Sequence, residues 1–138
     1  MQEVKIDGTI NTSADKVWEL VSDFGGLDIF VEAVEECTVK GQGTGAVRTL
    51  TLQDGGKVEE KLESLDNDKM VLEYSIVESP MPIKNYRGRI EVNKLSDSTS
   101  EFIWSSTFKA EDGTEKEMEK ALAGLYSVGV EGLKNRFS

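Results

Sequence analysis

The sequence contains no histidine and only one cysteine, Cys37. Histidine is the commonest general base and a common zinc ligand, and structural zinc sites otherwise need several cysteines. We therefore expect no metal site and no cofactor. A single cysteine also excludes an intrachain disulfide, which fits a reducing compartment. No pattern places a cation or base beside Cys37, so we expect a packed and unreactive thiol.

Long apolar runs and an excess of positive charge are also missing. No apolar segment is long enough to cross a bilayer, and the N-terminal segment alternates instead of forming the apolar part of a signal peptide. We therefore expect a cytoplasmic protein without membrane insertion. The chain has 16 Lys and Arg against 26 Asp and Glu, a net charge of −10. This charge favours solubility and disfavours binding to nucleic acid or an anionic lipid surface.

Two hydrophobic patterns fill the 138 residues, a length that suits one domain over residues 1–138. A short helix is predicted after Ser13, the expected N-cap, and a second over residues 27–31. A long amphipathic helix is predicted over residues 115–137, with Thr114 and Glu117 as a capping box. Polar and apolar residues alternate, as in strands with one buried face, over residues 4–10, 34–40, 46–53, 57–65, 70–77, 86–94 and 101–109.

The order of these elements predicts an α+β helix-grip fold. Strands that follow each other through short turns pair antiparallel. The apolar face of the resulting sheet has one large partner available, the C-terminal helix. We therefore expect a curved antiparallel sheet of about seven strands around that helix, with two short helices between the first and second strands and a cavity between sheet and helix.

Turn lengths predict that Glu60 points into this cavity. Three-residue turns at 54–56 and 66–68 would place Glu60 opposite Leu50 on one side and Tyr74 on the other. The apolar faces of the three strands agree with this register. An inward carboxylate is costly unless it is paired or hydrated.

Arg48 shares the inner face and is expected diagonal to Glu60, within reach of a long side chain. Three interpretations remain open. The two residues could form an internal ion pair with the Tyr74 hydroxyl that serves only the fold. Glu60 could be a polar anchor in a partly wet cavity. Alternatively, a register error could leave Glu60 outside.

Strand parity and the helix stripe supply the other candidates for the cavity wall. Parity turns Glu35 inward together with Cys37, and it places Tyr86, Trp104 and Phe108 on inner faces, where each could equally be core. Tyr126, at the edge of the helix stripe, could reach the cavity or solvent. The full set of expected ligand-binding residues is Glu35, Arg48, Leu50, Leu52, Glu60, Leu72, Tyr74, Tyr86, Trp104, Phe108, Leu122 and Tyr126.

The chain resembles the polyketide cyclase/dehydrase group of the superfamily of START lipid-transfer domains, birch pollen allergen-like proteins and abscisic-acid receptors. The resemblance implies a cavity between sheet and helix for lipids, polyketides, hormones or similar compounds. The order of its motifs along the whole chain carries the resemblance: residues 14–18, 43–48, 58–62 and 82–86, then the aromatic strand 102–108 and the final helix.

The resemblance also has implications for individual residues. In the related plant receptors, the loop that corresponds to residues 53–56 gates the pocket. Here that loop lacks the receptors' proline, which argues against hormone sensing of that kind. The receptors' pocket lysine corresponds to Glu35, and this reversal of charge disfavours an acidic ligand held there. Their pocket glutamate and tyrosine correspond to Glu60 and Tyr86.

Three functions are compatible with these observations. The first is binding of a small hydrophobic molecule by a monomer or weak homodimer. The second is a cyclase, dehydratase or hydrolase in which Glu60 or Glu35 is the acid or base and Arg48 or Tyr86 polarises a carbonyl. The third is an interaction domain without a ligand, whose core is filled by residues such as Trp104. Whether the chain is an enzyme is left open.

Overall fold

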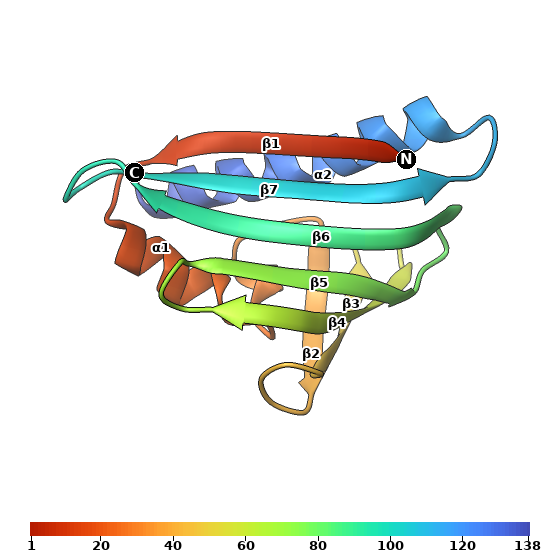
Figure 1. Cartoon of the computed structure of the whole chain (residues 1–138), viewed down its shortest axis with the longest axis horizontal. Helices are drawn as coiled ribbons and strands as arrows, with labels where there is room; N and C mark the ends of the chain where they lie inside the picture. Colours follow the sequence, from red (N-terminus) through yellow and green to blue (C-terminus); the bar gives the residue numbers. More distant parts are fainter.

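The computed structural model describes residues 1–138, and seven strands form one antiparallel sheet (Figure 1). The order across the sheet is β1-β7-β6-β5-β4-β3-β2, so every strand from β2 to β7 lies beside its neighbour in sequence. Short connections dictate this meander, and β1 closes the edge beside β7. The strands are β1 Gln2–Ile10, β2 Val34–Lys40, β3 Val47–Leu52, β4 Lys57–Asp66, β5 Val71–Glu78, β6 Ile83–Lys94 and β7 Ser100–Ala110.

The segment between β1 and β2 contains one short α-helix and one helical turn. Helix α1 covers Ala14–Val21, and the Ser13 hydroxyl caps it by accepting a hydrogen bond from the Lys16 amide at 3.3 Å. The second predicted helix is a single 3-10 turn, η1, over Leu27–Ile29. Both predicted elements are therefore present, the second shorter than expected.

The long helix α2 covers Glu115–Arg136 and begins without the predicted capping box. The Thr114 hydroxyl donates to the Glu111 carbonyl oxygen instead of accepting from the helix. None of the helices is both long and apolar enough to span a membrane.

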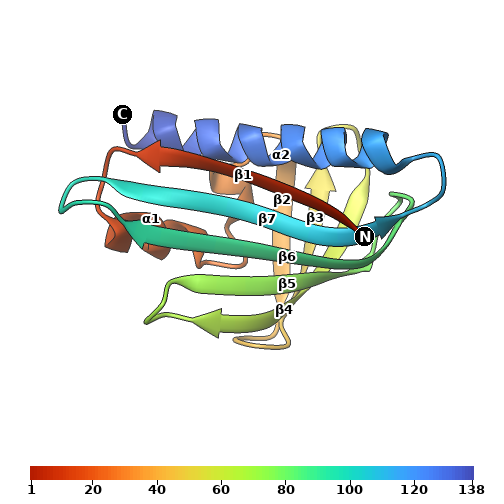
Figure 2. The same cartoon turned by 45° about the horizontal axis from the view of Figure 1, so that its top comes forward.

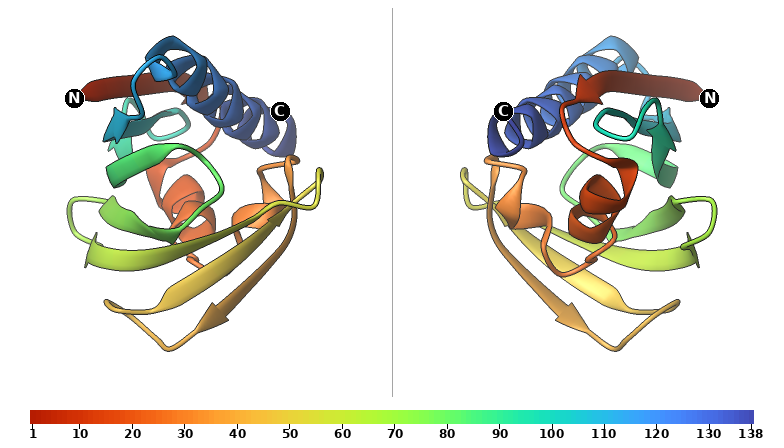
Figure 3. Two further views of the ribbon diagram at one scale, coloured as in Figure 1. Left: turned by 90° about the vertical axis from the view of Figure 1, so that its right-hand side faces the viewer. Right: turned by 90° about the vertical axis from the view of Figure 1, so that its left-hand side faces the viewer.

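The sheet curves around α2, which lies along its concave face (Figures 2 and 3). Seen end-on, the two edge strands β1 and β2 both turn toward the helix. The core lies between these layers. On β7, for example, Phe102, Trp104, Ser106 and Phe108 are at most 3% exposed, and the alternate residues 103, 105 and 107 are half-buried. This is the alternation expected of a sheet with one dry face.

The register across β3, β4 and β5 differs from the turn-based prediction by two residues at each hairpin. Arg48 lies directly opposite Glu60, where Leu50 was expected. Across the next pair, Tyr74 lies opposite Leu62. The first connection is longer than a three-residue turn, since Thr51 is the last residue of β3 that pairs with β4, and bulges interrupt the second pair. A two-residue shift preserves which face each side chain occupies, so Glu60 still points inward.

Candidate functional site

A cavity of about 270 Å³ lies between the inner faces of β3, β4 and β5 and helix α2. Of its 17 lining residues, 13 are hydrophobic, a composition typical of pockets for small molecules. The predicted residues that line it are Leu50, Leu52, Glu60, Tyr74, Tyr86, Trp104 and Leu122.

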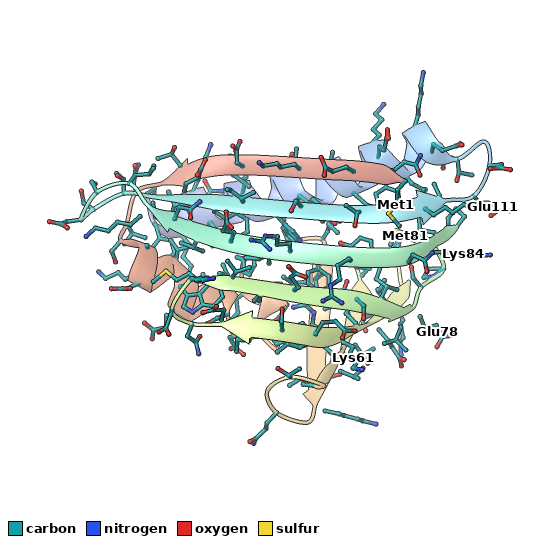
Figure 4. All side chains as sticks on the ribbon, viewed as in Figure 1. Met1, Lys61, Glu78, Met81, Lys84 and Glu111 are labelled. Atoms are coloured by element: carbon teal, nitrogen blue, oxygen red, sulfur yellow. The ribbon has the colours of Figure 1, made fainter.

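Two loops bound one end of this cavity. The β3–β4 loop contributes Asp54 and Gly56 to the lining, and the β5–β6 loop contributes Pro80 and Met81. Figure 4 shows Met81 at the end of the sheet where β6 begins, near Lys84. The Asp54 carboxylate accepts a hydrogen bond from the Gly56 amide at 2.8 Å, so its own loop partly satisfies it.

The main charged feature of the site is a buried ion pair. Arg48 is 2% exposed and Glu60 is 6% exposed. Arg48 Nε donates to Glu60 Oε1 at 2.8 Å, and Arg48 Nη2 lies 2.7 Å from the same oxygen, although its N–H groups are not aligned for a hydrogen bond. Direct cross-strand pairing of the two residues explains this short contact.

Arg48 is enclosed on its other sides. Its Nη1 donates to the Phe24 carbonyl oxygen at 3.2 Å. The guanidinium carbon lies 4.0 Å from the centre of the Phe24 ring and 5.0 Å from that of Tyr74. Arg48 is therefore held behind the cavity wall and does not line the cavity.

Burial raises the pKa of Glu60 above its ordinary value, and the neighbouring Arg48 charge opposes this shift without cancelling it. Arg48 lowers the pKa of Glu60 by its charge and by its hydrogen bond, but desolvation of the buried carboxylate is the larger effect, so the net shift is upward.

All three tyrosines of the chain meet beside this ion pair in one hydrogen-bonded chain. Trp104 Nε1 donates to the Tyr74 hydroxyl at 2.8 Å, and the Tyr74 and Tyr86 hydroxyls are 3.0 Å apart. Tyr86 also hydrogen bonds to Tyr126, whose hydroxyl donates to Ser106 Oγ at 2.9 Å. Strands β5, β6 and β7 and helix α2 thus share one polar network.

The direction of this network follows from its two ends. Indole can only donate, and each phenol has one proton. Since Tyr126 donates to Ser106, Tyr86 must donate to Tyr126, and Tyr74 to Tyr86. Burial raises the pKa of Tyr126 to about 12 and raises the pKa values of Tyr74 and Tyr86 well above the ordinary value of 10.0. The three phenols stay protonated at neutral pH, and all their protons are used internally.

Gly88 positions the Tyr74 ring. Gly88 on β6 is the direct cross-strand partner of Tyr74, and a Cβ at Gly88 would lie 2.2 Å from Tyr74 Cζ. The ring therefore occupies the space that a side chain at residue 88 would fill. Sequence reasoning did not identify this role, because it depends on the register between two strands.

Five of the expected site residues do not line the cavity. Glu35 is exposed, and its predicted inward orientation is wrong because a bulge between Val34 and Glu36 changes the parity of β2. The other four are buried, at most 2% exposed, but lie behind the wall or elsewhere in the core: Arg48, Leu72, Phe108 and Tyr126.

The lining also includes residues that sequence reasoning did not place there. Leu125 and Ala121 lie on the helix stripe, and Val58 and Ile76 lie on inward strand faces, so the hydrophobic pattern contained a signal for them. Leu27 and Val34 lie at the starts of η1 and β2. The remaining lining residues come from loops that no periodicity describes: Asp54, Gly56, Pro80 and Met81.

Comparison with known proteins identifies the class to which this fold and cavity belong. The whole chain, residues 1–138, matches the family described as polyketide cyclase / dehydrase and lipid transport. The chain therefore belongs to this family, in agreement with the resemblance inferred from its motifs.

Particular relatives are of two kinds. The abscisic acid receptor PYL2 of Arabidopsis thaliana is 29% identical over 101 residues, which cover 70% of this chain and 53% of the receptor. The chain thus spans about half the length of this curated relative. The solved structure of XoxI from Bacillus cereus is similar with a TM-score of 0.93 and 28% identity, over 99% of this chain and 96% of that one.

A further solved structure, the Zhui aromatase/cyclase from Streptomyces sp. R1128, has a TM-score of 0.85 over 98% of this chain and 92% of that one. Its sequence identity is 18%, so this likeness concerns the fold alone.

Proposed function

We propose that this protein binds a small, largely apolar molecule in the cavity between β3, β4, β5 and α2. The observation that carries the proposal is the composition of the cavity wall, which is mostly hydrophobic and holds one buried carboxylate, Glu60. Apolar walls with a few fixed polar groups are typical of ligand sites. A core that served stability alone would be packed without a void of this size.

The relatives support this proposal at the level of the class. The family is described by lipid transport as well as by cyclase and dehydrase activity, and the curated relative is named as a receptor for a small organic acid. We further propose that the protein acts in the cytoplasm as a monomer or weak homodimer. The high net charge of −10 favours solubility, and the lone cysteine needs no oxidising compartment.

Thermal unfolding in the presence of a library of small apolar compounds tests the proposal. A ligand that binds only the folded state raises the melting temperature in proportion to its concentration and affinity. We expect several compounds to do so. Native mass spectrometry of the purified protein should show the same compounds bound with one ligand per chain.

A pair of variants localises the binding. Val58→Phe fills the cavity, because Val58 is buried in its wall. Val77→Phe adds the same bulk at a position that is 57% exposed. Ligand-dependent stabilisation should disappear in the first variant and persist in the second. A binding function in this cavity would be contradicted if a compound stabilised both variants equally. It would also be contradicted if no compound stabilised the wild-type protein.

A second candidate function is a cyclase or dehydratase, and the raised pKa of Glu60 is the observation that favours it. Tyr86 cannot serve as the donor that polarises a carbonyl, because its proton is committed to Tyr126. An enzyme at this site would therefore depend on Glu60 alone. Turnover of a polyketide-like substrate by the wild-type protein, with loss of that turnover in Glu60→Gln, would support the enzymatic function. Binding of the substrate without turnover would support the binding function alone.

A further inference from the structure

One oxygen of the buried carboxylate has no protein partner. Both contacts from Arg48 go to Glu60 Oε1, and no protein group donates a hydrogen bond to Oε2. Glu60 is only 6% exposed and lines the cavity. The fully buried side-chain atoms without a hydrogen-bond partner are Arg48 Nη2 and Ser100 Oγ. Glu60 Oε2 is not one of them, so it is open to the cavity and offers an acceptor to a group on an occupant.

The same wall offers no free donor. Arg48 Nη2 is shielded from both solvent and cavity, and the rest of the guanidinium is engaged by Glu60 and Phe24. The protons of Tyr74, Tyr86 and Trp104 are used within the tyrosine network. No lysine lines the cavity. A carboxylate in the cavity would therefore find no cation or donor and would face the Glu60 charge.

A cationic occupant is also disfavoured. The Arg48 and Glu60 charges compensate each other at 2.7 Å, so an added ammonium group would be a buried charge without a counter-ion of its own. Asp54 is the other acidic residue of the wall, and it lies on an exposed loop where water screens its charge. A neutral hydroxyl or N–H group can satisfy Oε2 without this cost.

Cavity size limits the rest of the occupant. An engineered apolar cavity of about 150 Å³ accommodates benzene, and this one has about 270 Å³. The space suits a molecule somewhat larger than a single ring.

We propose, building on the binding function above, that the ligand is a neutral molecule of one or two rings, or an aliphatic body of that size. It carries one hydroxyl or N–H group that donates to Glu60 Oε2. The site thus selects against organic acids, in contrast to the acid for which the curated plant relative is named.

Four probes with one skeleton test this ligand class: 4-isopropylphenol, 4-isopropyltoluene, 4-isopropylbenzoate and 4-isopropylbenzylammonium. Affinities come from NMR titration of the ¹⁵N-labelled protein at neutral pH. We expect the phenol to bind about tenfold more tightly than the toluene, because a hydrogen bond to a charged group increases affinity by about that factor. The benzoate and the ammonium compound should bind more weakly than the phenol.

The double variant Arg48→Met/Glu60→Leu is the matched control. It removes both charges together, which buried ion pairs tolerate far better than the loss of one partner. The phenol and the toluene should bind this variant with similar affinity, and continued binding of the toluene shows that the cavity is intact. A preference for the phenol that survives in the variant would overturn the role of Glu60.

The outcomes separate this inference from the proposed function. If the wild-type protein binds the phenol and the toluene equally, or binds a charged probe best, the cavity is a ligand site but the inferred ligand class is wrong. If no probe binds, the proposed function and the inference both fail.

Discussion

At the scale of single residues, the buried polar side chains other than Ser100 form two connected units. One is the Arg48–Glu60 pair and the other is the chain from Trp104 through the three tyrosines to Ser106. Each group in the second unit is satisfied by its neighbour, as burial requires. Arg48 Nη2 and Ser100 Oγ are fully buried without a hydrogen-bond partner, and Glu60 Oε2 is the oxygen of the ion pair that no protein group donates to.

The buried network predicts how the tyrosines titrate. Their pKa values are raised above the ordinary value of 10.0, and that of Tyr126 to about 12, while unfolded tyrosines ionise near 10.0. As the pH rises, the tyrosines of the unfolded state lose their protons first. The contribution of these groups to the free energy of unfolding is therefore constant at lower pH and is lost as the pH rises above 10.0.

Ultraviolet absorbance of tyrosinate measures the ionisation of these three tyrosines directly, because the chain has no other tyrosine. Absorbance should appear in one step, together with the loss of near-ultraviolet circular dichroism. A tyrosine that titrates near 10.0 in the folded protein would show that at least one phenol is outside the network.

The sequence predicted the inward orientation of Arg48, Glu60 and Tyr74, because strand parity depends only on alternation. It did not predict that Tyr126 reaches the network. The rotation of a helix over a sheet is set by packing, and residue 126 lay at the edge of the stripe. Gly88 was invisible for a related reason, since its role exists only opposite Tyr74.

At the scale of elements, the close approach of helix α2 to the β1–β2 connection depends on a glycine in the helix. A Cβ at Gly132 would lie 1.9 Å from the carbonyl oxygen of Phe30. That oxygen is backbone and cannot rotate away, so any larger residue must displace the helix or the connection. Gly129 similarly leaves room for Trp104, whose ring a Cβ there would approach to 2.7 Å.

Gly132→Ala should therefore destabilise the protein by about 1–3 kcal/mol, the range for overpacking. Gly124→Ala is the control on the same helix, because a Cβ at Gly124 meets nothing within 4 Å. It should stabilise the protein by about 0.5–1 kcal/mol through helix propensity. Urea unfolding of both variants gives the two values, and stabilisation by both would contradict the close approach.

Element types were predictable, and element pairing only in part. The seven strands and the long helix follow from periods of two and of three to four residues. Exact register did not follow, because a longer β3–β4 connection and the bulges in β4 and β2 leave no mark in hydrophobicity. Because of the bulge between Val34 and Glu36, Glu35 is exposed, although the sequence predicted it in the cavity wall.

At the scale of the whole molecule, the curved sheet and α2 enclose more space than their side chains fill. Large aromatic side chains such as Trp104 and Phe108 occupy the part near β6 and β7. Smaller aliphatic residues on β3 and β4, such as Leu50 and Val58, leave the cavity open. Side-chain size along the sheet therefore determines where the cavity lies.

The position of a bound ligand is the most direct measurement of this arrangement. Intermolecular nuclear Overhauser effects between 4-isopropylphenol and the methyl groups of Leu50, Val58 and Leu122 should appear, since all three line the cavity. Methyl groups of exposed residues such as Val77 and Leu95 should show none. Contacts confined to exposed residues, with none to the three cavity residues, would contradict an internal ligand site.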